Sequence, residues 1–218
     1  FLTLTYKEDP FTLNVRDFQL FMKRLRKKVG KVRFFHCGEY GSLNFRPHHH
    51  ALIFGWRPPD LEIFGKSVAG YIYRSDLLES LWSFGFSTVG DVTFDSAAYV
   101  ARYILKKQTG PTAEVHYQGR KPEYITMSRN PGIGQKWFNA YSGDVFPKDY
   151  IHYEGGKIAR PPRYYEKLFE LNHAADLKQI KERRLAFVLQ NPDEVSPSRL
   201  YQKEEVLSAK LNLNERKL

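Results

Sequence analysis

The 218-residue chain contains a single cysteine, Cys37, which excludes a disulfide framework and a zinc cluster built on cysteines. It also has no run of about 18 apolar residues, so no membrane-spanning helix is predicted. No signal peptide, internal repeat or low-complexity tract is visible. These absences favour a protein of a reducing compartment that does not enter a membrane.

Positive charge is in excess, because Lys and Arg total 34 against 24 for Asp and Glu, giving a formal net charge of +10. Such a balance favours an anionic partner, either nucleic acid or a membrane surface. The 14 Tyr and 16 Phe favour nucleic acid, since bases stack on aromatic rings. Many basic proteins bind no nucleic acid, so composition alone leaves that alternative open.

The order of predicted elements indicates the fold class. FLTLTY (1–6) alternates like a strand, and a helix follows between a cap at Asn14 and Gly30. Its inward side is predicted to comprise Phe18, Leu20, Phe21, Met22 and Leu25. Strands are then predicted at 31–40, 48–55 and 86–94, a loop at 56–74, and helices starting after Ser75 and after Asp95 or Ser96. The order β-α-β-β-α-β-α predicts an α+β, ferredoxin-like split βαβ fold with a central antiparallel sheet.

Beyond residue 110 the pattern is weaker. EYITM suits a strand, QKWFNAY a helix behind PGIG, and 162–216 two charged helical stretches broken at NPDEVSPS. We therefore predict a core at 1–110, additional elements packed on it at 111–160, and a C-terminal helical extension at 161–218.

The segment RPHHHALIFG (46–55) places three histidines at the start of a predicted strand. Side chains alternate along a strand, so His48 and His50 share one face and His49 points to the other. Glu39 ends the preceding strand and joins that face if paired residue numbers add up to 87 or 89. Two imidazoles and a carboxylate suit Mg²⁺, Mn²⁺ or Zn²⁺. The alternative is that the histidines merely end a strand; Cys37 is predicted to be a buried neighbour rather than a ligand.

The segment AAYVARYILKK holds Tyr99 and Tyr103 at i and i+4 on one helix face, which Lys107 continues and Lys106 borders. A tyrosine hydroxyl can attack a phosphodiester whose phosphate is polarised by a metal ion. A nearby ammonium would neutralise the developing charge. An ordinary half-buried helix shows the same stripe, so the pattern alone leaves both interpretations open.

Taken together, FLTLTY, GEYG with RPHHHALIFG, and YVARYILKK resemble the three motifs of the HUH-superfamily replication initiators. FHCGEYG, GDVTFDSAAYVARYILKK, TMSRNPGIG and RPPRYY further resemble one branch, the replication initiation proteins of gokushovirus-like Microviridae. The resemblance covers about residues 1–215, and the combination is far more specific than any single motif. It implies the HUH endonuclease fold.

The resemblance implies a rolling-circle replication initiator of a single-stranded DNA phage, acting in the host bacterial cytoplasm. Such an enzyme nicks and rejoins single-stranded DNA at the origin of the replicative-form DNA through a 5′-phosphotyrosine intermediate. We expect Mg²⁺ or Mn²⁺ as cofactor, and a host helicase and polymerase as further partners. By similarity, the site consists of the metal ligands His48, His50 and Glu39, the nucleophiles Tyr99 and Tyr103, and the helix lysine, Lys107 or Lys106.

Two departures from the family pattern stand out. Position 49, usually a bulky hydrophobic residue in the superfamily, is His49, which leaves the ligand spacing intact. The Cys-rich stretch that usually precedes the first motif is absent, and the chain opens at Phe1 without a Met. We therefore expect the sequence to be a fragment.

Other cationic and glycine-containing segments carry weaker predictions. Arg46 and Arg102 are candidate DNA contacts, although Arg46 equally suits a solvated turn. IFGKS (63–67) resembles the end of a phosphate-binding loop, but Asp60 occupies the position that requires Gly, so no nucleotide site is predicted. The first helix is predicted to present a solvated face rather than a DNA groove with Arg24, Arg26, Lys27 and Lys28.

Two competing functions remain open. A non-catalytic single-stranded nucleic-acid-binding module would use sheet aromatics such as Phe34 and Phe35, but it leaves the His, Glu and Tyr residues without a role. A transposase or plasmid relaxase shares the chemistry but not the FHCGEYG and TMSRNPGIG segments.

Overall fold

The computed structural model describes residues 1–218 except 42–43, 68–69, 103–106 and 216–218. They form two compact units, Phe1–Asn130 and Pro131–Leu218, which we describe separately. The division predicted at 110 and 160 stays a prediction. Within the described residues, no helix combines the length and the apolar character that a membrane span requires.

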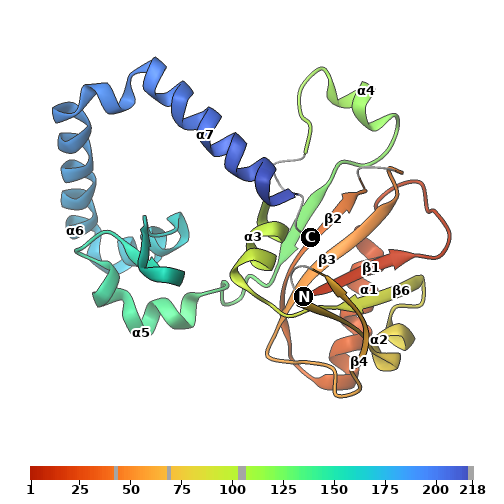
Figure 1. Cartoon of the computed structure of the whole chain (residues 1–218). Coiled ribbons are helices and arrows are strands. Elements are labelled where there is room, and N and C mark those ends of the chain that lie inside the picture. Colours follow the sequence, from red (N-terminus) through yellow and green to blue (C-terminus); the bar gives the residue numbers. More distant parts are fainter. Residues whose placement is uncertain (42–43, 68–69, 103–106, 216–218) are drawn as a thin grey trace. The chain divides into compact units, whose positions relative to one another are not determined.

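The first unit is built on a seven-stranded sheet with the order β4-β5-β6-β1-β3-β2-β7, in which all pairs are antiparallel (Figure 1). Helix α1 (Val15–Val29) connects β1 to β2 while β3 lies between them, which is the predicted split βαβ unit. The predicted α+β class with a large antiparallel sheet is confirmed. The strands are β1 Leu2–Tyr6, β2 Arg33–Tyr40, β3 Pro47–Phe54, β4 Glu62–Ser67, β5 Gly70–Arg74, β6 Gly85–Val89 and β7 Tyr124–Met127.

The hairpin β4–β5 lies at one edge of the sheet, in the segment predicted to be a loop, so that prediction was wrong. Ile63 and Phe64 are both exposed although they are neighbours in β4. A bulge between Ile63 and Gly65 shifts the register. An edge strand with a bulge and two exposed apolar neighbours has no period of two, which is why the pattern was missed.

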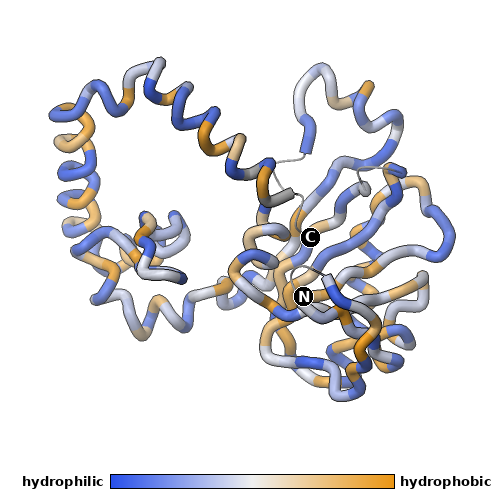
Figure 2. The backbone as a smooth tube through the Cα atoms, in the orientation of Figure 1, coloured by the Kyte–Doolittle hydropathy of each residue, from blue (hydrophilic) through white to orange (hydrophobic). Residues whose placement is uncertain are grey.

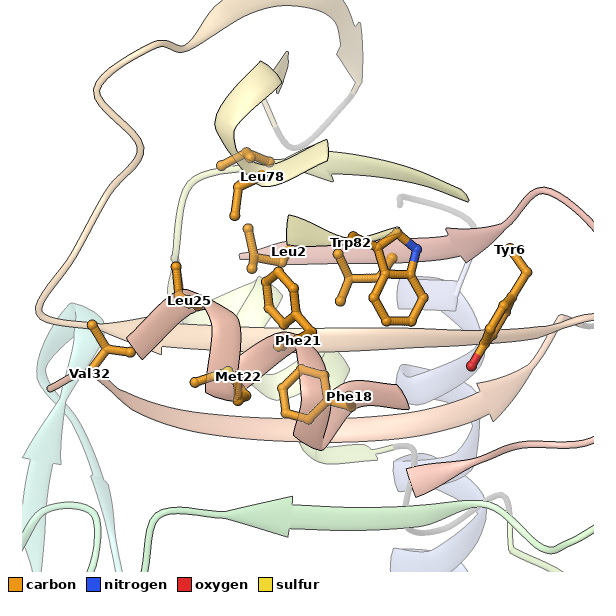
Figure 3. Close-up of a cluster of buried hydrophobic side chains, with 12 residues drawn as sticks. Leu2, Tyr6, Phe18, Phe21, Met22, Leu25, Val32, Leu78 and Trp82 are labelled. Atoms are coloured by element: carbon orange, nitrogen blue, oxygen red, sulfur yellow. The ribbon is translucent and has the colours of Figure 1, made fainter. Parts of the chain in front are cut away.

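Helices α1 and α2 (Asp76–Leu81) cover one face of the sheet, which we call the α1 face. Asn14 caps α1 by accepting from the Arg16 N–H, and Gly30 ends the helix at φ 86°. Leu20, predicted to face inward, is only half-buried and lies outside this core. Figure 3 shows the cluster that fills this layer, which includes Leu2, Tyr6, Phe18, Phe21, Met22, Leu25, Val32, Leu78 and Trp82.

Helix α3 (Phe94–Arg102) packs on β2 and β3 from the opposite face, which we call the α3 face. Its Val100 lies against Cys37 and Leu52 in a second buried cluster. The N-cap is Thr93, whose hydroxyl accepts from the Ser96 N–H while the Ser96 hydroxyl accepts from the Thr93 N–H. The helix therefore begins before the predicted cap at Asp95 or Ser96, and the strand predicted at 86–94 ends at Val89.

The rest of the first unit and the second unit confirm the predicted order after residue 110, with β7 at EYITM and a helix behind PGIG. The second unit packs around Phe138, Val145, Phe146, Leu177 and Ile180. Helix α7 mixes hydrophilic and hydrophobic residues along its length (Figure 2), and its described side chains are exposed. The remaining elements are α4 Ala113–Tyr117, α5 Gln135–Val145, β8 Ile151–Tyr153, η2 Glu154–Gly156, β9 Lys157–Ala159, α6 Arg163–Gln190, η3 Pro192–Val195 and α7 Pro197–Glu215.

The glycines of the PGIG segment have a structural reason. A Cβ at Gly132 would lie 2.2 Å from the hydroxyl oxygen of Tyr164, and one at Gly134 would lie 2.6 Å from that of Tyr165. Gly134 also has φ 83°, which favours glycine. The TMSRNPGIG and RPPRYY segments are thus two halves of one packing contact.

Candidate metal and tyrosine site

The register of β2 and β3 brings three predicted ligands to one place. Paired residue numbers add up to 87, so Glu39 lies opposite His48, and Cys37 opposite His50. Glu39 Oε1 lies 2.7 Å from His48 Nε2 and 3.1 Å from His50 Nε2. One ligand atom from each of the three residues lies within 4.8 Å of the others. The predicted register is confirmed, whereas the role of these residues as metal ligands stays a prediction.

The Nδ1 atoms of both histidines are held by neighbours, so the Nε2 atoms converge on the carboxylate. His48 Nδ1 lies 3.1 Å from the Arg46 carbonyl oxygen, and His50 Nδ1 lies 3.1 Å from Thr3 Oγ1. A carbonyl only accepts, so His48 donates from Nδ1 and a neutral ring presents a lone pair at Nε2. That lone pair faces a carboxylate oxygen at 2.7 Å. Two acceptors this close require a cation between them, either a proton or a metal ion.

Glu39 is ionised in this setting although its side chain is almost fully buried. Burial alone would raise the pKa of Glu39, but the hydrogen bonds from His48 and His50 outweigh it and lower the pKa to about 2. A metal ion needs its carboxylate ligand in this deprotonated state. The three side chains therefore fit a divalent ion in charge, direction and spacing.

Helix α3 places Tyr99 beside these ligands. The Tyr99 ring meets the His50 ring edge-on with centroids 5.7 Å apart, and the Phe1 ring stacks on His50 at 5.4 Å. Tyr99 is half-buried, in the cluster that contains Cys37. Of the predicted nucleophiles and lysines, the structure thus brings Tyr99 to the site.

The other predicted residues of this segment are not brought to the site. Tyr103 and Lys106 lie outside the described residues. Lys107 is exposed and follows that gap, and Arg102 is the half-buried last residue of α3. The predicted roles of these four residues stay predictions.

Arg46 fixes the rim of the site. Its guanidinium Nη2 donates to the carbonyl oxygens of Tyr6 at 2.9 Å and Lys7 at 3.3 Å, while its own carbonyl accepts from His48. Arg46 thus joins the end of β1 to the start of β3, and its predicted contact with DNA stays a prediction. Thr3, which holds His50, was missed. The alternation of Thr with Leu in FLTLTY was the signal that would have placed it on the α3 face.

His49 lies on the α1 face, where it belongs to a buried chain of hydrogen bonds that the sequence reasoning missed. His36 Nδ1 lies 2.8 Å from Thr126 Oγ1, and His36 Nε2 lies 3.1 Å from His49 Nδ1. His49 Nε2 lies 2.9 Å from the Tyr6 hydroxyl, which donates to Asp17 at 2.8 Å. The donors all point one way along the chain, because Tyr6 gives its only proton to Asp17.

Both imidazoles of this chain are neutral. Burial, reinforced by the nearby histidines, lowers the pKa of His49 to about 3 and that of His36 well below its ordinary value. The His36 ring also stacks on Phe18 with centroids 3.4 Å apart. With the paired numbers adding up to 87, His36 and His49 are diagonal neighbours, so the register would have revealed the contact.

Several other predicted residues have structural roles. Asp60 accepts from the Ser75 hydroxyl at 2.6 Å and the Leu77 N–H at 2.8 Å. These hydrogen bonds hold the start of α2 and lower the pKa of Asp60. IFGKS forms β4. On α1, Arg24 donates to the Leu81 carbonyl and Arg26 to that of Val32, so these two cations hold the α1 face together.

Comparison with known proteins identifies the family. Residues 1–108 match the family of the replication-associated protein ORF2. The chain is 36% identical over 186 residues to replication-associated protein VP4 of Bdellovibrio phage phiMH2K. It belongs to the phage replication-associated proteins. The resemblance that the motifs indicated is confirmed.

Two further relatives belong to the same family. Replication-associated protein ORF4 of Chlamydia phage 1 is 33% identical over 181 residues, and ORF2 of Spiroplasma virus 4 is 29% identical over 229 residues. The matches cover 79%, 77% and 95% of this chain, in the order given. They cover 58%, 45% and 67% of the three relatives, so the chain spans about half the length of the first two. No solved structure matches.

Proposed function

We propose that the chain is the HUH endonuclease core of a rolling-circle replication initiator, which nicks and rejoins single-stranded phage DNA at its origin. The observation that carries the proposal is the meeting of Glu39, His48 and His50 beside the Tyr99 ring on one face of the sheet. Family membership supports a role in replication, and the net charge of +10 suits DNA. The cofactor in this proposal is Mg²⁺ or Mn²⁺.

The ligands have separate tasks in this mechanism. Glu39 supplies charge, while His48 and His50 supply Nε2 lone pairs whose direction is fixed by the Arg46 carbonyl and Thr3. Bound by these three groups, a divalent ion would polarise the scissile phosphate and neutralise charge on the leaving oxygen.

The tyrosine carries the covalent step. The Tyr99 hydroxyl oxygen bonds to phosphorus and loses its proton to solvent, and the bond from phosphorus to the 3′ oxygen breaks. The products are a 5′-phosphotyrosine and a free 3′-hydroxyl that a host polymerase can extend. In the proposal Tyr103 repeats the step on the regenerated site, Lys107 or Lys106 neutralises charge, and Arg46 and Arg102 contact DNA. A host helicase would unwind the duplex, in the host bacterial cytoplasm.

The binding-module alternative loses its predicted residues. Phe34 packs against the α1-face core and stacks edge-on with Phe18, whereas Phe35 packs in the cluster of Cys37. Neither ring is an open platform for a base, so the predicted Phe34 and Phe35 surface is wrong. The convergence of Glu39 with the two histidines also has no purpose in a module that only binds.

The test is an assay for an SDS-resistant adduct between the protein and labelled single strands from its own replicon, with Mn²⁺ or with EDTA. We expect a metal-dependent band that persists in Tyr99→Phe or Tyr103→Phe alone and disappears in the double variant. Wild-type protein that binds the DNA without any adduct, both as this chain and with an N-terminal extension, would contradict the proposal.

Tyr124→Phe is the matched control. The Tyr124 hydroxyl lies on the α1 face and is buried, and it has no hydrogen-bond partner among the described residues. Its removal leaves the metal ligands untouched, so the adduct band should keep its wild-type intensity. A band weakened equally in Tyr124→Phe would mean that the assay reports folding rather than chemistry.

A further inference from the structure

The α3 face has an open half beside the metal ligands. On β1 and β6, the side chains of this face are Thr3, Thr5, Thr88 and Phe86, of which the threonines are half-buried and Phe86 is 51% exposed. On the opposite face of the same strands, Leu4, Ser87 and Val89 are buried under the helices. Helix α3 packs on β2 and β3, so it covers the other half of its face.

Phe86 is aligned with the ligands by the strand register. Phe86 lies opposite Thr5, Thr5 lies opposite His48, and His48 lies opposite Glu39. These residues form one row across four neighbouring strands. Two strand spacings separate Phe86 from His48, which is about 10 Å. That distance corresponds to about three nucleotide steps along a stacked strand.

An exposed phenylalanine in the interior of a sheet calls for an occupant. Strand β6 lies between β5 and β1, so Phe86 is not at an edge. Within the part of the chain that the structure describes, no other ring contacts Phe86. Burying such a ring against a flat partner is favourable, and a base has the matching flat apolar face.

Charge and hydroxyl groups around the row suit a single strand. Arg46 and Lys7 are exposed at the end of β1, where the Arg46 guanidinium donates to the Lys7 carbonyl. The threonine hydroxyls beside Phe86 are of the type that contacts phosphate and sugar oxygens. A strand crossing this surface would meet cations and hydroxyls at its backbone and one ring at its bases.

We propose that Phe86 is a base-stacking subsite, on which a base within about three nucleotides of the scissile phosphate stacks. The inference rests on the proposed function for the position of that phosphate. The subsite binds any base, because every base has a π face. Its effect is to hold an unpaired segment flat on β1 and β6 with the backbone directed toward His48.

The test measures the affinity for a labelled single-stranded oligonucleotide by fluorescence anisotropy in EDTA, so that its outcome does not depend on cleavage. Phe86→Ala should weaken binding roughly 5- to 100-fold, and Phe86→Trp should restore it. The matched control is Phe64→Ala, which removes an equally exposed phenylalanine (60%) from edge strand β4 and should bind like wild type. Circular dichroism of each variant checks folding.

A crosslinking experiment locates the base. 5-Iododeoxyuridine is placed in turn along the oligonucleotide, and the crosslinked peptide is identified after irradiation. We expect the peptide that contains Phe86. Wild-type affinity in Phe86→Ala, equal losses in Phe86→Ala and Phe64→Ala, or crosslinks confined to other peptides would overturn the subsite. An enzyme that nicks normally yet gives any of these results would retain the proposed function without the subsite.

Discussion

Three consecutive histidines serve two opposite environments on the two faces of β3. On the α3 face, His48 and His50 direct Nε2 toward an ionised carboxylate, and His48 is partly exposed. On the α1 face, His49 is fully buried and its ring nitrogens meet His36 and Tyr6. One face concentrates charge around an accessible point, whereas the other satisfies every ring nitrogen with a neutral partner.

The comparison shows that residue type does not decide chemistry. An imidazole beside a carboxylate at the rim of a sheet is suited to a cation, because the carboxylate stays ionised. An imidazole sealed among aromatic rings stays neutral and acts as a buried hydrogen-bonding group. The hydrophobic residue usual at position 49 in the superfamily is thus replaced by a polar residue that still belongs to the core.

The largest effect is expected on the α3 face. Glu39→Gln keeps the shape of the side chain but removes the charge, so Mn²⁺ affinity should fall roughly 100-fold or more, beyond the 10- to 100-fold typical of residues that only support a ligand. The measurement is a Mn²⁺ titration followed by electron paramagnetic resonance. His49→Leu is the control and should retain Mn²⁺ binding once its folded fraction is taken into account. Unchanged affinity in Glu39→Gln would contradict the ligand assignment.

The next effect concerns the stability of the α1 face. His49→Leu leaves the buried His36 Nε2–H without its acceptor, so the free energy of unfolding should fall by about 1–3 kcal/mol. The double variant His36→Leu with His49→Leu removes both partners and should lie within about 1 kcal/mol of wild type. Urea unfolding of the four proteins of this cycle measures the coupling. Strictly additive losses would show that the two imidazoles do not act as a pair.

A third prediction concerns pH. The folded-state pKa values of His36 and His49 lie below the unfolded value, so only the unfolded chain gains these protons as the pH falls below about 6.5. The free energy of unfolding should therefore decrease between about pH 6 and pH 5, by about 1.4 kcal/mol per pH unit for each buried histidine. The His36→Leu, His49→Leu double variant should lose this part of the slope. Equal slopes for both proteins in urea unfolding would exclude the buried pair as the cause.

The smallest effect is expected for Tyr124→Phe. The hydroxyl is buried without a partner among the described residues, and burial raises the pKa of Tyr124. Its removal should leave the free energy of unfolding unchanged or raise it by roughly 1 kcal/mol. Urea unfolding measures this directly. A clear loss of stability would reveal a hydrogen bond to this hydroxyl.

Much of the first unit was predictable from periodicity. The alternation in FLTLTY, the helix between Asn14 and Gly30, and the β2–β3 hairpin follow from the local sequence, because the burial of one face imposes a period. The register that joins Glu39 to His48 was one of two predicted possibilities. The arithmetic of a two-residue period narrowed the choice but did not select between 87 and 89.

The rest depends on contacts that no local pattern encodes. The edge hairpin β4–β5 has exposed apolar neighbours, so its strands do not alternate. Asp60 has its role because a helix start at Ser75 lies beside it, 15 residues away in the chain. Phe86 looks like any strand phenylalanine until the helix α3 is seen to cover only the other half of its face.

Mapping the adduct by mass spectrometry tests the central claim most directly. Wild-type protein is allowed to react with single strands from its replicon in Mn²⁺, the DNA is digested, and the peptide that carries the nucleotide is sequenced. The account predicts a phosphodiester-linked nucleotide on Tyr99 or Tyr103, absent in EDTA and absent from Glu39→Gln. A nucleotide on any other residue, or an adduct that forms equally well in EDTA, would contradict it.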